Sequence, residues 1–550
     1  MASSLMLRFL CVYATMFALA GCGSADDRPN VLIIVADDLG YSDIGVFGGE
    51  IGTPNLDQLA SQGLQLTHFH TATNCSPTRA MLMTGMDNHK VGLGTMAEVM
   101  ALRYPELNQF PGYEGYLNFR AKPLPEVMRD AGYRTYMTGK WHLGLEKETS
   151  PYARGFQQTY AMVEGAAGHL DDRQYVPGIN RERVIYRRNG EVTEIPEDFY
   201  STAAFADELI GFLRKDQDRP EPFFAYLAFT APHWPLQAPK SSIQRYKGKY
   251  DQGYDELFAA RLSHQKALGL IADDVEGQVH QPGAKPWSEL TNDEQAYSAR
   301  LMEVYAAMVG DMDYHVGEVL QAIEDMGELD NTVVLFMSDN GAEGNTADRA
   351  PAWRKFVDAG FDNSYENLGA VSSYVFYGTE WARVSALPSR LFKSNPTQGG
   401  ILSPAILSYG AALGESRRYN EFLSVMDVMP TVLELAGIEY SGEEELPIMG
   451  RSFASLLTDA NTSIHPEDFE MGWEMVDHRA YRLGDWKLVM TQPPRGDGSW
   501  ELYNLADDPS ENKNLAEQEP ALFAELQARW HSYAERNDVV VFENGKVPTR

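Results

Sequence analysis

Cys75 begins the segment whose residue types and spacing carry the most specific chemical information in this chain. Pro77 and Arg79 follow it at alternate positions, and Thr84-Gly85 close the segment. Residues of these types at these spacings seldom occur together by chance, so the segment predicts a reactive site. Pro77 suits the first turn of a helix, which places position 75 near a helix N-terminus, where a bound anion is stabilised. The alternative is a buried free cysteine at a helix start, since unmodified cysteine usually packs as a small hydrophobic side chain.

Polar side chains that can bind or catalyse follow four apolar runs of the sequence. Residues 31–36 form a continuous apolar run, as expected for a strand buried on both faces, and residues 134–138, 223–229 and 332–336 also read as strands. In order, the polar residues after these runs are Asp37 and Asp38, Lys140 and His142, His233, and Asp339 and Asn340. Ligand sites in open α/β sheets lie outside the carboxyl ends of the strands. The four segments therefore predict one crevice.

Four of these residues form a set of hard oxygen ligands: Asp37, Asp38, Asp339 and Asn340. An all-oxygen set with three carboxylates selects Ca²⁺ or Mg²⁺ over zinc. Larger oxygen cages favour Ca²⁺, with Mg²⁺ as the alternative. Taken alone, each Asp-Asp or Asp-Asn pair reads equally well as a loop or helix cap, so the metal site depends on its spacing from the cysteine motif.

Strand-like runs alternate with helical patterns, the longest of them at 294–326. This alternation predicts an α/β fold with a large mixed, mainly parallel sheet between helices. After about Ile438 the pattern changes to short strand-like segments at 469–474, 480–483, 486–490 and 500–503, followed by an amphipathic helix at 521–537. We expect a catalytic domain over 29–440 and a smaller C-terminal antiparallel-sheet subdomain with a terminal helix over 441–550.

The segment 341–398 is long and rich in aromatic side chains. Its aromatic residues include Trp353, Tyr374, Tyr377 and Trp381. Long ordered loops are usually functional, so we expect this segment to form the wall and lid of the crevice. For any one of these rings, a position on the surface with no role in the crevice is an equally open interpretation. Such a wall suits an aryl or a sugar group, because both stack on aromatic rings.

Composition excludes one broad class of function. The chain has 550 residues, of which 44 % are hydrophobic, and its formal net charge is −32. The apolar content suits a globular core. Nucleic-acid binding needs a basic footprint, so the strong negative charge argues against it. An anionic substrate would have to find a local cluster of basic residues.

The N-terminal residues have the pattern of a secretory leader peptide. An apolar run over 9–20 follows Arg8, is too short to span a bilayer and ends in small residues, as a secretory signal does. Leu19 to Cys22 resembles the bacterial lipobox, which implies a signal peptide over 1–21, lipidation of Cys22 and a polar tether over 22–28. No Asp follows Cys22, which by the lipoprotein rule favours the outer membrane. The alternative is an ordinary leader that contains a cysteine. With Cys22 lipidated, no structural disulfide is expected.

From about Pro29 to Leu515 the chain resembles the type I sulfatases, and within them the bacterial arylsulfatases of the Pseudomonas type. The motif C-x-P-x-R with T-G matches the signature of that family. The other matching segments are 30–40, 138–144, 231–235, 338–341, Lys393 ahead of 397–400, 485–488 and 502–505. One departure is Ile401-Leu402, where many relatives carry Ile-Arg.

The resemblance implies an alkaline-phosphatase-like fold and oxidation of Cys75 to Cα-formylglycine by a formylglycine-generating enzyme. The hydrated aldehyde would attack the sulfur of a sulfate ester, activated by Asp339 and one divalent cation, with Cys75 also counted among the metal ligands. Arg79 and Lys140 would steady the diol and the charge near the metal. Lys393 and His233 would bind sulfate and assist the leaving oxygen. His142 would then help remove a proton from the second hydroxyl, which expels sulfate.

Sulfate monoester hydrolysis, acting on aryl sulfates or sulfated sugars, is thus the expected function. A phosphonate monoester or phosphodiester hydrolase of the same superfamily is the alternative enzyme, since it shares the cysteine motif. The full set of basic residues around the motif, Lys393 among them, favours sulfate. A catalytically silent lipoprotein that binds sulfated glycans is the alternative outside enzymes, but it would be expected to have lost part of the signature. The natural ester, the choice between Ca²⁺ and Mg²⁺ and the oligomeric state stay open.

Overall fold

The computed structural model describes residues 28–179, 181–278, 280–281, 284–346, 351–413, 416–440, 446–543 and 545–548. The expected signal peptide, Cys22 and the tether up to residue 27 lie outside the described residues. Arg28 is described, and its guanidinium donates a 2.8 Å hydrogen bond to the Ala131 carbonyl. Within the described ranges, no helix is both long enough and apolar enough to cross a membrane.

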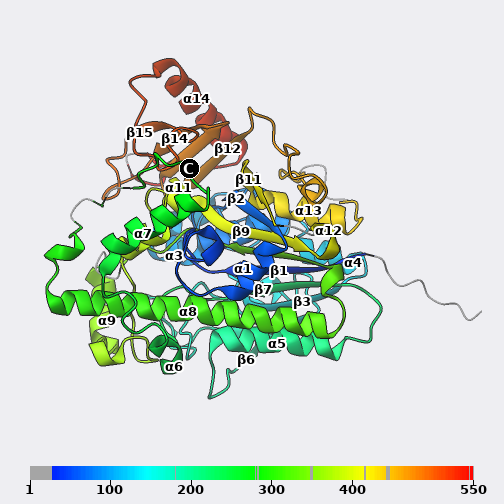
Figure 1. Ribbon diagram of the computed structural model, residues 1–550. Coiled ribbons are helices and arrows are strands. Elements are labelled where there is room, and N and C mark those ends of the chain that lie inside the picture. Colours follow the sequence, from blue (N-terminus) through cyan, green and yellow to red (C-terminus); the bar gives the residue numbers. More distant parts are fainter. Residues whose placement is uncertain are drawn as a thin grey trace, which may run out of the picture.

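A large mixed sheet forms the centre of the described chain (Figure 1). Its strands run in the order β10-β2-β9-β8-β1-β7-β3-β4-β5-β6, and β11 pairs with β2. The central strands β8, β1, β7, β3 and β4 are parallel, whereas β9 is antiparallel to both of its neighbours. The expected mixed, mainly parallel sheet is therefore confirmed. The strand bounds are β1 Asn30–Ala36, β2 Leu64–His70, β3 Arg134–Lys140, β4 Gln158–Met162, β5 Tyr186–Arg188, β6 Glu191–Thr193, β7 Phe223–Ala228, β8 Thr332–Ser338, β9 Leu402–Tyr409, β10 Arg417–Tyr419 and β11 Leu423–Ser424.

Helices cover both faces of this sheet. Strand β1 shows why: Leu32 and Ile34 belong to one hydrophobic core, and Val31 and Ile33 belong to another. Because successive side chains of a strand point to opposite faces, a continuous apolar run serves two cores. Helices α1, α5 and α8 pack on one face, as Figure 1 shows, and α2, α4 and α13 contribute to the core of the other. The helix bounds are α1 Pro54–Ser61, α2 Cys75–Thr84, α3 Ala97–Arg103, α4 Leu124–Asp130, α5 Ser201–Lys215, α6 Lys240–Gln244, α7 Gly253–Ala267, α8 Asn292–Asp325, α9 Pro351–Gly360, α10 Thr379–Ser385, α11 Gln398–Ile401, α12 Gly410–Leu413, α13 Val428–Leu435 and α14 Pro520–Arg536.

A separate antiparallel sheet lies above the large one in Figure 1. It consists of β12 Glu470–Met475, β13 His478–Leu483, β14 Trp486–Met490 and β15 Trp500–Asn504. Helix α14 packs on it through Leu526 and Trp530. The small antiparallel sheet with a terminal helix was expected from the sequence and is confirmed.

Buried polar contacts join the small sheet to the rest of the chain. Lys487 of β14 donates hydrogen bonds to Glu511 at 2.8 Å and to Gln398 of α11 at 3.1 Å. His89, which follows α2, lies 3.3 Å from Glu474 of β12. Helices α2 and α11 flank the expected crevice, so the small sheet is attached beside it.

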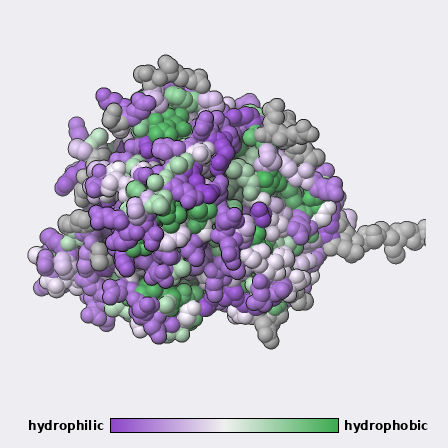
Figure 2. All heavy atoms as spheres, turned by 90° about the horizontal axis from the view of Figure 1, so that it is seen from above, coloured by the Kyte–Doolittle hydropathy of each residue, from purple (hydrophilic) through white to green (hydrophobic). Residues whose placement is uncertain are grey.

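The surface on the side of the small sheet is mostly hydrophilic, with separate hydrophobic patches between the polar areas (Figure 2). This agrees with the net charge of −32. The polar residues of the expected crevice are buried, so they contribute little to this surface.

Candidate active site

The polar residues predicted to share a crevice do lie together. Strands β8, β1, β7 and β3 are consecutive neighbours in the sheet and run parallel. Their carboxyl ends therefore meet at one edge. In strand order, these ends carry Asp339 and Asn340, Asp37 and Asp38, His233, and Lys140 with His142. The site follows from the direction of the strands and not from closeness in sequence.

Three carboxylates and three cations pair at this edge. Lys140 Nζ lies 2.7 Å from Asp37 Oδ2, and Lys393 Nζ lies 2.7 Å from Asp38 Oδ1. Arg79 donates from Nε and from a terminal nitrogen to Asp339 Oδ2, at 2.9 and 2.7 Å. All six side chains are buried. The three pairs cancel formally, so this cluster has no net charge although charge is dense.

Local backbone features place the cations. Gly139 has φ +108°, and a Cβ built there would lie 1.8 Å from the Ala228 carbonyl oxygen. Only glycine allows this close approach, and it sets Lys140 at the end of β3. Lys393 is fixed on the other side, because its backbone N–H donates to the Ala342 carbonyl and that of Ser394 donates to the Thr73 carbonyl.

The carboxylates differ in their electrostatic surroundings. Burial alone would raise the pKa of Asp37, but Lys140, followed by His233 and Arg79, lowers it below the usual range. Burial raises the pKa of Asp38 to about 8; Lys393 opposes the rise and the Asp37 carboxylate adds to it. These adjacent carboxylates therefore compete for the same cations, and an added divalent cation would favour ionisation of both.

The geometry suits such a cation. One ligand atom each of Asp37, Asp38, Cys75 and His233 lie within 4.8 Å of one another. His233 Nδ1 is 2.6 Å from the Trp234 carbonyl and so carries the proton, which leaves a lone pair on Nε2. Asn340 donates to Asp38, while its buried Oδ1 has no hydrogen-bond partner among the described residues. A lone pair and an unpartnered carbonyl oxygen are both groups that a cation satisfies.

Cys75 is the first residue of α2, as predicted. Arg79 lies four residues later, one turn along the helix, so both side chains lie on the same side of α2. Cys75 was expected to be exposed in the crevice, but it is only 1 % exposed. It is one of the residues that line a cavity of about 450 Å³, together with His142, His233 and Lys393. Burial raises the pKa of its thiol, against the effect of Lys140 and Lys393.

Glu98 is a site residue that the sequence analysis missed. Its Oε2 lies 3.1 Å from Nε2 of His142, and it lines the same cavity as Cys75. Glu98 belongs to the short helix α3, which no recognised motif includes. A Met-Ala-Glu sequence at a helix start is unremarkable, so only the fold could identify this residue.

The aromatic segment 341–398 agrees only in part with the expected wall. Trp353 lines the cavity. Tyr377 and Trp381 do not, because both are buried in the core on the α8 side of the sheet. Tyr374 is buried as well and supports Trp353 by accepting a 3.0 Å hydrogen bond from the indole nitrogen. The expected wall position is therefore wrong for Tyr374, Tyr377 and Trp381. Aromatic side chains of a long loop can pack into the hydrophobic core as readily as they can line a cavity.

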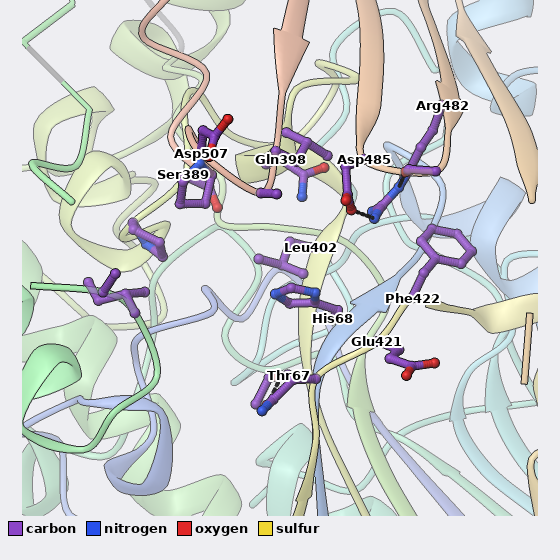
Figure 3. Close-up of a pocket in the computed structure, with 18 of the residues that line it drawn as sticks. Thr67, His68, Ser389, Gln398, Leu402, Glu421, Phe422, Arg482, Asp485 and Asp507 are labelled. Atoms are coloured by element: carbon purple, nitrogen blue, oxygen red, sulfur yellow. Dashed lines mark hydrogen bonds and ion pairs between the residues drawn. The ribbon is translucent and has the colours of Figure 1, made fainter. Parts of the chain in front are cut away.

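A larger cavity, of about 1,090 Å³, lies elsewhere, between β2 and the small sheet (Figure 3). His68 and Phe422 line it, and Arg482 points toward Asp485 across 3.9 Å. Burial lowers the pKa of Arg482 to about 10, and Asp485 offsets only part of this effect. The predicted catalytic and metal-binding residues do not line this cavity, although Gln398, Asp485 and Leu505 of the matching segments do, so cavity size does not identify the catalytic site here.

Comparison with known proteins agrees with this geometry. The sulfatase family model matches residues 29–438, and a model described as the C-terminal part of N-sulphoglucosamine sulphohydrolase matches residues 397–536. An uncharacterised sulfatase of Schizosaccharomyces pombe is 43 % identical over 528 residues, which cover 93 % of this chain and 94 % of the relative. An arylsulfatase of Klebsiella aerogenes is 38 % identical over 454 residues, covering 80 % of this chain and 95 % of the relative.

Solved structures share the fold. The crystal structure of Ps i-CgsB in complex with a neocarrahexaose aligns with a TM-score of 0.66 and 23 % identity, covering 94 % of this chain and 95 % of that chain. The fold is thus that of sulfatases, which are alkaline-phosphatase-like, as expected. The chain belongs to the sulfatase family. It is a sulfuric ester hydrolase of the arylsulfatase type.

Proposed function

We propose that this sulfatase hydrolyses sulfate monoesters through residue 75 after its oxidation to Cα-formylglycine, with one bound Ca²⁺. The observation that carries the proposal is the position of Cys75. It lies where the Asp37–Asp38 carboxylates, His233 and the cavity meet. When bound, the metal ion would act as a Lewis acid and orient the ester. A hydrated aldehyde would supply two hydroxyls on one carbon, so the enzyme could release sulfate by elimination.

The remaining groups have separate tasks. Lys393 binds the sulfate oxygens. His233 lines the same cavity, and with a proton on Nε2 it would donate to the leaving oxygen, a role in which Nε2 is not a metal ligand. Lys140 and Arg79 hold Asp37 and Asp339 in place. His142 lines the cavity beside Cys75 and accepts a proton from residue 75. Preorganised cations in a buried site stabilise developing negative charge better than water does.

Cys75 provides the direct test. Cys75→Ala removes the nucleophile, so turnover of nitrophenyl sulfate should be lost while Tm stays near that of the wild type. Mass analysis of the wild-type peptide that contains residue 75 should detect the aldehyde or its hydrate. Cys75→Ser should be nearly as inactive as Cys75→Ala. Full activity in a preparation whose peptide carries only unmodified cysteine would contradict the proposal, and faster turnover of a nitrophenyl phosphonate monoester would favour the alternative hydrolase.

The metal site makes a separate prediction. Asp37→Asn keeps the shape of the side chain but removes a charge that pairs with Lys140. We expect elemental analysis to find about one divalent ion per wild-type chain, chiefly calcium, and much less in the variant, with nearly all activity lost. Asp57→Asn, a carboxylate outside the site that accepts from the Val46 N–H, is the matched control and should keep its metal. A pair of zinc ions in the wild type would instead indicate an alkaline phosphatase.

We also propose, from the lipobox at Leu19 to Cys22, that the enzyme is exported as a lipoprotein and anchored at the outer membrane through Cys22. A multiply acylated cysteine anchors stably, whereas one acyl chain does not. Cys22→Ser should therefore move the activity from the membrane fraction to the soluble fraction, or leave the leader uncleaved, without changing the specific activity. Wild-type activity found wholly in the cytosol with the leader intact would disprove the anchor and leave the enzymatic proposal intact.

A further inference from the structure

The lining of the catalytic cavity is of two kinds. One part is reactive and holds Cys75, His142, His233 and Lys393. Another part, which we call the outer wall, is apolar; it consists of Val99, Leu102, Trp234, Trp353, Phe376 and Pro493, and polar side chains such as Asn345 and Gln492 lie in the same lining. Leu102 is 44 % exposed, although it is a large aliphatic residue. Apolar side chains that stay open to solvent around a pocket mark a surface that a ligand covers.

The aromatic part of this outer wall is held in place. Trp234 and Trp353 meet edge to face with ring centroids 5.5 Å apart, and Phe376 lies 5.4 Å from Trp234. The rings rest on a small core that includes Tyr374, and the Trp234 indole nitrogen lies 3.4 Å from Glu343 Oε2. The Trp234 ring also lies 4.5 Å from the His233 ring. The wall therefore begins beside the residue expected to assist the leaving oxygen.

We propose that this sulfatase selects sulfate esters of apolar aryl or alkyl alcohols, with the leaving group packed against Trp234, Phe376 and Leu102. This inference rests on the proposed function. Trp234, Phe376 and Leu102 offer the hydroxyl groups of a sugar no free hydrogen-bond partner, and burying such groups unpaired is costly. Charged and polar side chains also line the cavity, and two of them, Glu98 and Arg103, belong to the same helix α3 as Leu102, so the test has to separate the two kinds of lining.

Two sulfate esters of primary alcohols test the selection, because their leaving groups have similar intrinsic reactivity. We expect kcat/KM for hexyl sulfate to exceed that for the ester of the primary hydroxyl of glucose by at least tenfold. Leu102→Asn and Phe376→Ser should each lower kcat/KM for hexyl sulfate by about tenfold or more, since one apolar contact contributes this much discrimination. Neither should change turnover of the sugar ester appreciably. Leu268→Asn, an exposed leucine outside the cavity, is the control.

A wild-type preference for the sugar ester, or loss of turnover of both esters in these variants alike, would overturn the inference while the enzyme stays a sulfatase. Failure to hydrolyse any sulfate ester, nitrophenyl sulfate included, would instead count against the proposed function. The two outcomes are therefore distinguishable.

A different observation concerns His142. Its imidazole is 6 % exposed, and its Nδ1 is buried with no hydrogen-bond partner among the described residues. Its Nε2 lies 3.1 Å from Glu98 Oε2. Burial would raise the pKa of Glu98, but His142 lowers it to about 2. The Glu98 carboxylate accepts a hydrogen bond from Nε2, so this nitrogen carries a proton, and Nδ1 is the nitrogen left to exchange a proton.

We infer that Glu98 is a positioning residue that fixes the tautomer and orientation of His142 for proton transfer at residue 75. A buried acid that holds an imidazole in the required tautomer is a known arrangement in hydrolases. Gly165 lies beside the same contact, because a Cβ there would come within 2.7 Å of both Glu98 Oε1 and His142 Nε2, so the lack of a side chain leaves room for the pair. Lys140 and Glu164 are charged groups near Glu98; Lys140 is paired with Asp37, and Glu164 is paired with Arg181.

The test separates positioning from folding. In Cys75→Ala protein labelled at histidine nitrogens, NMR should show His142 protonated on Nε2, and this signal should change in the Glu98→Ala background. With Cys75 intact, Glu98→Ala should lower kcat by about 10- to 100-fold with little change in KM. Glu98→Asp should recover part of the loss, and Glu106→Gln, on an exposed glutamate just after α3, should be neutral. An unchanged His142 signal, or a lower Tm with an unchanged kcat, would overturn the inference.

Discussion

The three buried carboxylate–cation pairs at the strand ends are the interaction on which the active site depends. Burying a charge is costly unless it is paired and hydrogen-bonded, and Asp37, Asp38 and Asp339 each have a cationic partner within 3 Å. The same pairs would also suit the ligands of the proposed function. A divalent cation binds to carboxylates, and the sulfate group of an ester binds to ammonium groups. The two ligands together would therefore make up for the contacts that each carboxylate–cation pair loses.

The fold explains why these charges are found at one edge. Strands β8, β1, β7 and β3 are buried on both faces, so charged side chains are confined to their ends, as Arg134 and Lys140 are in β3. Charges can follow only where the strands end. Positive φ angles at Asp38 and His142, 68° and 55°, show that the chain turns sharply there. Backbone strain of this kind is held by surrounding structure and is common at functional sites.

The sequence predicted most of this arrangement because apolar runs and the polar residues after them are local patterns. The strands, helix α8 and the start of α2 at Cys75 required no knowledge of tertiary contacts. What it missed depends on packing between distant segments. Glu98 contacts His142 across 44 positions, and Trp381 enters the core where a wall was expected. The closeness of His233 to the carboxylates likewise depends on how β7 pairs with β1.

The reacting groups and most of the outer wall come from different parts of the fold. The reacting groups lie on strand ends and at the start of α2, whereas the outer wall comes mainly from α3, α9, the segment before α10 and the loop after β14; Trp234, next to His233, is the exception. Peripheral segments can change without moving the strand ends. This accounts for a common fold with Ps i-CgsB, a protein solved with a neocarrahexaose, at only 23 % identity. The family and the reaction are therefore read from the strand ends, and the choice of alcohol has to be read from the wall.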